Sequence, residues 1–65
     1  MTEEDIVKCA NYSYQAVTFF SNFMKEMNQP GKEEMYTLAK KGFENAVEIH
    51  SSTDELLKAM RHGAT

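Results

Sequence analysis

The sequence predicts an all-α protein, an antiparallel helical hairpin that is expected to pair into a four-helix bundle. Three observations lead to this fold class. Apolar residues recur every three or four positions along both halves of the chain, which is the period of a helix with one buried face. The single Pro-Gly pair, Pro30-Gly31, divides the chain near its middle. The apolar face of each half is also wider than one neighbouring helix can cover.

Length and composition bound the possible classes of protein. A chain of 65 residues is expected to form one helical domain, residues 1–65. Hydrophobic residues make up 42% of it and charged residues 26%, which excludes general disorder. The net charge of −3 argues against broad nonspecific binding to nucleic acid. No apolar run approaches the roughly 18 residues of a membrane span, and the acidic start does not resemble a signal peptide. The lone Cys9 fits a reducing compartment, so we expect a cytoplasmic protein without membrane contact.

The first half of the chain predicts one long helix over about residues 3–28. Thr2 is a suitable N-cap, and Asp5 stands three residues later, where it makes an imperfect capping box. Two adjacent apolar stripes form a wide face: Ile6, Ala10, Ser13, Val17, Phe20, Met24 and Met27 in the first, and Cys9, Tyr12, Ala16, Phe19 and Phe23 in the second. A face of this width is typical of a helix that packs against more than one neighbour.

A turn is predicted at residues 29–31, because Pro30 disfavours helical backbone at the preceding residue and Gly31 permits a positive φ. A second helix is expected over about residues 32–61, with Gly31 as its N-cap. Its apolar face is predicted along Met35, Leu38, Gly42, Ala46 and Ile49, flanked by Tyr36, Ala39, Phe43, Val47 and His50. Glycine inside a helix costs about 1 kcal/mol relative to alanine. Gly42 is therefore either simply tolerated or marks a close approach to an aromatic ring such as Phe19 or Phe20.

Residues 51–53 leave two possibilities open. The apolar spacing continues through them without proline or glycine, which favours one continuous helix. Ser52 and Glu55, however, have the form of a capping box, which would start a short third helix at residues 53–62 after a kink. In that alternative the third helix folds back over the hairpin, and the protein is a monomeric three-helix bundle.

The apolar surface of the predicted hairpin exceeds what its single line of contact can bury. Burying one large apolar side chain is worth roughly 1.5–3 kcal/mol, so several exposed ones forfeit much of a small domain's stability. We expect a second copy in a homodimer, or another protein's helix, to cover this surface. The sequence thus predicts a small interaction or regulatory module that associates with itself. The residues predicted to form its core and interface are Ile6, Tyr12, Val17, Phe19, Phe20, Phe23, Met24, Leu38, Phe43, Ile49, Leu56 and Met60.

Catalytic, metal and cofactor signatures are missing from the sequence. Pairing outward from the turn sets Cys9 opposite about residue 52, which makes His50 a possible neighbour, but a nucleophile and its base also need an orienting group. No His-x-x-x-His or Cys-x-x-Cys spacing is present, and three glycines do not make a phosphate-binding loop. We therefore expect no enzyme activity, no metal, no cofactor and no small-molecule substrate.

Binding to nucleic acid is the alternative function that the sequence leaves open. The basic residues that could form a small patch are Lys25, Lys40 and Lys41, or alternatively Lys58, Arg61 and His62. In length and hairpin layout the chain resembles the Rop-type RNA-binding four-helix-bundle proteins, which are also acidic. The resemblance is one of architecture without a shared motif, so it implies RNA binding only as an expectation and assigns no site residue.

Overall fold

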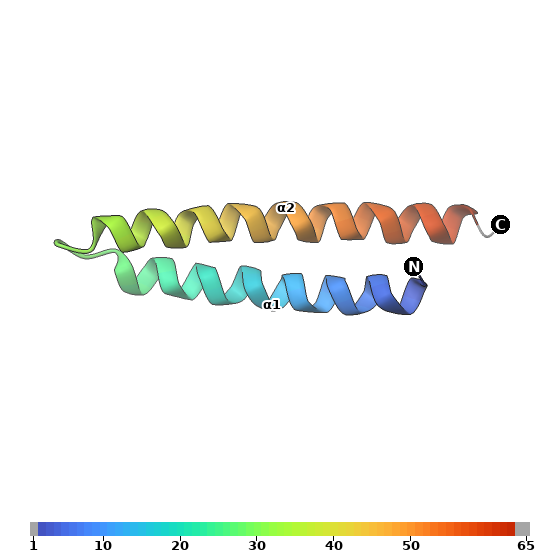
Figure 1. The fold of residues 1–65 in the computed structure, drawn as a ribbon, viewed down its shortest axis with the longest axis horizontal. Helices are drawn as coiled ribbons and strands as arrows, with labels where there is room; N and C mark the ends of the chain where they lie inside the picture. The colour runs from blue at the N-terminus through green and yellow to red at the C-terminus, as the bar shows by residue number, and fades with distance from the viewer. Residues whose placement is uncertain (1, 64–65) are drawn as a thin grey trace.

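The computed structural model describes residues 2–63, which form a hairpin of two antiparallel helices (Figure 1). Helix α1 spans Glu3–Met27 and helix α2 spans Glu33–Gly63, whereas the sequence placed the two helices at about residues 3–28 and 32–61. The hairpin measures 53 × 15 × 13 Å, and α2 extends past the start of α1 (Figure 1). The predicted all-α hairpin is confirmed. Residues 1 and 64–65 of the predicted domain lie outside the described residues.

A complete capping box begins α1. The hydroxyl oxygen of Thr2 accepts the backbone N–H of Asp5 at 3.2 Å, and the Asp5 carboxylate accepts the backbone N–H of Thr2 at 3.3 Å. Two of the N–H groups that an isolated helix leaves without partners are thereby satisfied. The predicted capping box is confirmed, although an aspartate stands where a glutamate is more usual.

The turn between the helices depends on the left-handed backbone of Gly31, whose φ is +88°. The sequence predicted this freedom, but Gly31 is not the N-cap of α2. The carbonyl of Lys32 accepts the first helical hydrogen bond, from the N–H of Tyr36 at 2.9 Å, so Lys32 occupies the cap position. The Glu33 carboxylate instead accepts the N–H of Gly31 at 3.1 Å. Hydrogen bonds from the N–H groups of Glu33 and Gly31 lower the pKa of the Glu33 carboxyl.

Helix α2 runs through residues 51–53 without a kink, so the alternative of a third helix at residues 53–62 is wrong. Thr53 explains how the helix continues. Its hydroxyl donates to the carbonyl oxygen of Ile49 at 2.7 Å, one turn back, and does not cap a new helix. The fold-back lid of the three-helix alternative therefore does not form over the described hairpin.

The helices meet along a line of buried and half-buried side chains that we call the seam. In both helices these side chains alternate at intervals of three and four residues, which is the pattern of coiled-coil packing. The seam residues of α1 are Ile6, Ala10, Ser13, Val17, Phe20, Met24 and Met27, and those of α2 are Tyr36, Ala39, Phe43, Ala46, His50, Thr53, Leu57 and Met60. The α1 residues are the first predicted stripe, which is confirmed.

The predicted face of α2 needs a correction. Met35, Leu38 and Ile49 were expected to point at α1, but they are exposed. Ala46 of the predicted face does lie buried in the seam, but beside it the seam follows residues that were expected to flank that face, with Ala39 fully buried and Tyr36 half-buried. The most deeply buried positions of α2 hold small side chains. A stripe of small residues lets two helices approach closely, whereas the larger aliphatic side chains stay outside.

Candidate interaction face

Two linked hydrogen bonds lie in the middle of the seam. Ser13 Oγ lies 3.0 Å from His50 Nδ1, and the Ser13 hydroxyl donates to the carbonyl oxygen of Ala10 at 3.0 Å. A hydroxyl has one proton to donate. When that proton goes to Ala10, Ser13 accepts the Nδ1–H of His50, which sets the tautomer of the neutral imidazole. The Tyr14 ring covers His50 from one side, with ring centroids 6.0 Å apart.

Another side-chain hydrogen bond, between Cys9 and Thr53, lies one helical turn from the Ser13–His50 pair. Cys9 Sγ lies 3.5 Å from Thr53 Oγ1, and the Thr53 hydroxyl donates to Ile49. Thr53 therefore accepts the thiol proton of Cys9. Sequence spacing set Cys9 opposite residue 52, one position from its observed partner. Among the described residues, no buried side-chain nitrogen or oxygen lacks a hydrogen-bond partner. The Ser13–His50 and Cys9–Thr53 hydrogen bonds fix the axial register of the two helices, because sliding one helix by a turn would separate both pairs of residues.

The pairing of Ser13 with His50 does not have the geometry of an activated nucleophile. Ser13 is buried, and in the tautomer described above Nδ1 donates a proton to the hydroxyl instead of accepting one. Cys9 is exposed and pairs with Thr53, so the neighbouring Cys9 and His50 each bond to a different residue. Among residues 2–63, no group of three or more metal-ligating side chains comes together.

Ser13→Ala tests the polar layer of the seam. The substitution leaves His50 Nδ1–H without its partner, so we expect it to lower the free energy of unfolding by about 1 kcal/mol. The exposed Ser51→Ala is the matched control, and it is expected to change stability by less than about 0.5 kcal/mol. Urea titration of both variants at equal protein concentration gives the comparison. Equal stabilities would mean that the hydrogen bond at Ser13 contributes nothing net.

Large apolar side chains gather on one side of the seam, on a surface that we call the apolar face. Each of its stripes keeps the seven-residue spacing of the seam, so each lies along the hairpin. Contacts show that the two helices contribute to the same side: Cys9 and Leu56 line one depression, together with Asp5, Ile6 and Thr53. The apolar face consists of Cys9, Tyr12, Ala16, Phe19 and Phe23 from α1 and Met35, Leu38, Gly42, Ile49 and Leu56 from α2.

An aromatic cluster joins the seam to the apolar face. The ring of Phe20 lies directly against Gly42, where an added Cβ would come within 2.5 Å of Phe20 Cε1. Phe19 meets Phe20 edge to face at a centroid distance of 5.2 Å, and Phe23 lies 6.2 Å from Phe19. Gly42 therefore marks a close approach to an aromatic ring and is not merely tolerated. Of the two explanations that the sequence left open, the structure supports this one.

The residues that the sequence assigned to the core and interface differ in how much of each side chain is exposed to water. Ile6 is the member with a fully buried side chain, at 2% exposure. The half-buried members are Val17, Phe20, Phe23, Met24, Phe43 and Met60, and the exposed members are Tyr12, Phe19, Leu38, Ile49 and Leu56. The exposed members all lie on the apolar face. Tyr12 is 71% exposed and Phe19 62%, so the hairpin itself leaves these rings in water.

No family model, curated protein or solved structure matches this chain. The assignment of a function therefore rests on the residues themselves. The described helices include none that is long and apolar enough to cross a lipid bilayer.

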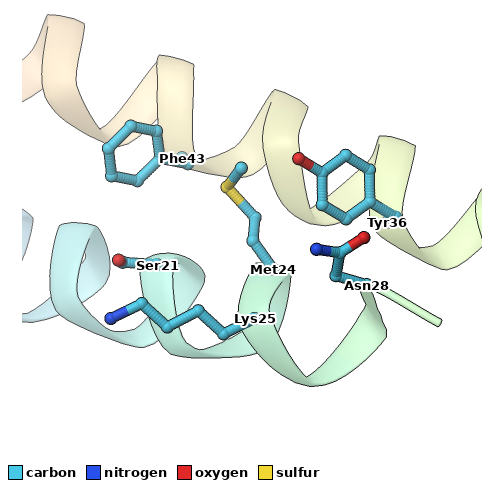
Figure 2. A pocket seen from close by; sticks show the side chains of 6 residues that line it. All are labelled: Ser21, Met24, Lys25, Asn28, Tyr36 and Phe43. Carbon is cyan, nitrogen blue, oxygen red and sulfur yellow. The ribbon is translucent and has the colours of Figure 1, made fainter.

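A depression near the turn lies on the other side of the seam and is lined by both helices (Figure 2). Its volume is about 190 Å³, and Met24 points between the rings of Phe43 and Tyr36, with Lys25 and Asn28 at the rim. Pockets that enclose a small molecule usually measure about 300–1,000 Å³. This depression is smaller and open, so it does not favour a ligand site.

The two alternative basic patches lie far apart. Lys40 and Lys58 are eighteen positions apart on α2, which is about 27 Å of helix at 1.5 Å per residue. Lys58 is 3.1 Å from the carboxylate of Asp54, and Arg61 is 3.3 Å from that of Glu3. The hairpin thus does not gather these cations on one surface. Phosphate backbones are bound by clusters of uncompensated cations, so the arrangement gives weak support to nucleic-acid binding.

The sequence placed Cys9, Ala16, Met35 and Gly42 on apolar stripes but did not count them among the core and interface residues, and they lie on the apolar face. The signal that finds them is the seven-residue spacing between equivalent positions, such as Met35, Gly42, Ile49 and Leu56. That spacing becomes informative once the seam of α2 is known.

Proposed function

We propose that the protein is a non-enzymatic interaction module, which binds the helices of another protein chain on its apolar face and thereby completes a four-helix bundle. The observation that carries the proposal is the exposure of Tyr12, Phe19, Leu38, Ile49 and Leu56 on one continuous side of the hairpin. Exposed apolar patches of this extent, rimmed by polar residues, mark interaction surfaces in soluble proteins. The free thiol of Cys9 supports a reducing, cytoplasmic location.

The distribution of charge supports the same proposal. Lysine and arginine are absent from the apolar face, whereas the ion pairs Lys8–Glu4 and Lys58–Asp54 lie on other stripes of the helices. Depletion of charge together with enrichment of aromatic residues and methionine is typical of the central part of protein interfaces. A helical hairpin provides two helices to such an interface, and a partner with two helices buries both.

Photo-crosslinking in the cells that make the protein tests this function. A photoreactive phenylalanine analogue at position 19 is expected to form adducts with a protein chain, because Phe19 is an exposed aromatic residue of the apolar face. The same analogue at Gln15, an exposed residue of α1 outside that face, is the control and is expected to give few adducts. Equal yields at the two positions would contradict the proposal. A gel shift with RNA or DNA at low salt, abolished by charge reversal of Lys40 and Lys41, would contradict it as well.

A further inference from the structure

We propose that the partner on the apolar face is a second copy of this chain, so that two hairpins stack face to face about a two-fold axis. This inference rests on the proposed function and names the partner of the same surface.

The interior of one hairpin is too small to hold the fold alone. Only five described residues are buried, and among them Ile6 is the single large apolar side chain that is fully enclosed. The others are two alanines, a serine and a threonine. A domain this short often gains stability from a partner subunit. A partner that stabilises the fold has to be present when the chain folds, and a second copy always meets that condition.

The hairpin is large enough to form a standard interface along one side. That whole side, 53 Å long and 15 Å wide, covers about 800 Å² in projection, which is the area that each partner contributes to a standard protein–protein interface, and the apolar face lies within it. Two-fold pairing buries the same patch on both copies. Phe19 and Leu38, which are 62% and 59% exposed in one hairpin, would then both leave water in each copy.

Charge does not oppose the pairing, although each copy carries a net charge of −3. The stripe that carries Tyr12 and Phe19 has Asp5 and Glu26 only at its two ends. The remaining charged side chains lie on stripes that point away from the face. Stacking two copies therefore keeps most like charges on the outside of the assembly, where water and salt screen them.

Sedimentation velocity of the full chain over a dilution series tests the inference, with circular dichroism on the same samples. We expect the mass to rise from 7.4 kDa toward twice that value with concentration. Helicity and the thermal midpoint should rise in parallel, because folding and pairing are coupled. Reducing agent is kept in all samples, so that a disulfide through Cys9 does not produce the dimer.

Two matched variants locate the interface. Phe19→Lys is expected to raise the dimer dissociation constant by at least ~30-fold, the effect of removing a central aromatic residue from an interface. Tyr14→Lys is the control, because Tyr14 is an equally exposed aromatic residue of α1 on the other side of the seam. It is expected to change the constant by less than ~3-fold. Leu38→Lys places the same charge on α2 and should act like Phe19→Lys.

The outcomes separate the inference from the proposed function. A folded wild-type chain that stays at 7.4 kDa at every concentration overturns the second copy as partner. If that monomer binds an apolar fluorescent dye, and Phe19→Lys but not Tyr14→Lys abolishes the binding, the face remains open for another protein and the proposed function stands. A monomer without such dye binding overturns both. A dimer that Tyr14→Lys dissociates and Phe19→Lys leaves intact also overturns both.

Discussion

Replacing Gly42 with alanine is expected to lower the free energy of unfolding by up to about 2 kcal/mol, although the same change favours an isolated helix. Alanine is better than glycine inside a helix by about 1 kcal/mol. In this hairpin the new Cβ would lie 2.5 Å from Phe20 Cε1 and 2.7 Å from two further ring carbons, so the ring has to move. Overpacking of this kind costs typically 1–3 kcal/mol, and it also disturbs the edge contact between Phe20 and Phe19.

A double-mutant cycle with Phe20→Ala isolates this contact. Once the ring is removed, the clash is gone, and Gly42→Ala is expected to stabilise the chain by up to about 1 kcal/mol through helix propensity alone. The four chains are compared by urea titration at equal concentration and in the same stabilising osmolyte, because Phe20→Ala alone weakens the fold. Gly63→Ala is the control, since nothing lies within 4 Å of the added Cβ. If Gly42→Ala has the same effect with and without the ring, Phe20 does not determine the need for glycine.

Local signals account for the part of the fold that the sequence predicted well. Thr2 and Asp5 form the capping box across three residues, and Pro30 with Gly31 forms the turn, so neighbouring residues carry the whole signal. The seam of α1 was also predictable from local spacing. Its polar residue Ser13 interrupts an otherwise apolar stripe, yet the spacing of three and four residues was regular enough to place it in the seam.

Which of two adjacent stripes of α2 forms the seam could not be predicted, because the choice depends on contacts with α1. Two adjacent stripes of α2 are apolar, and the sequence favoured the one with larger side chains, such as Leu38 and Ile49. The structure favours the stripe with Ala39, which allows close approach, and with His50, whose hydrogen-bond partner is 37 residues away. Ala46, which the sequence had placed on the other stripe, lies in the seam as well. Helix periodicity alone contains no information about such distant partners.

The α1 half of the apolar face was predicted as the second stripe of the first helix, whereas its α2 half was not separated from the residues expected to contact α1. The width of the stripes indicated that one hairpin leaves large side chains uncovered, and the exposure of Tyr12 and Phe19 agrees with that expectation. Which residues lie together on that side follows from the seam. Once Thr53 and Ile6 are placed in the seam, Cys9 and Leu56 fall beside each other on the apolar face.

Ala39→Leu is expected to lower the free energy of unfolding by about 1–3 kcal/mol, because Ala39 is the most deeply buried residue of the seam, at 0% exposure. Alanine and leucine have similar helix propensities, so the effect reports packing between the helices and not the stability of α2 itself. A leucine at this position has to push α1 away from α2. That separation also lengthens the contacts at neighbouring levels of the seam, so the helical signal in circular dichroism should melt at a lower temperature.

Ala59→Leu is the matched control for this prediction, because Ala59 is exposed on the same helix. The identical change there should alter stability by less than about 0.5 kcal/mol. Thermal melts of both variants at one protein concentration provide the comparison. If Ala39→Leu were as stable as Ala59→Leu, the helices would have room for a larger side chain at residue 39. Small residues would then not be what selects the seam of α2, and the stripe through Leu38 and Ile49 would compete with it for contact with α1.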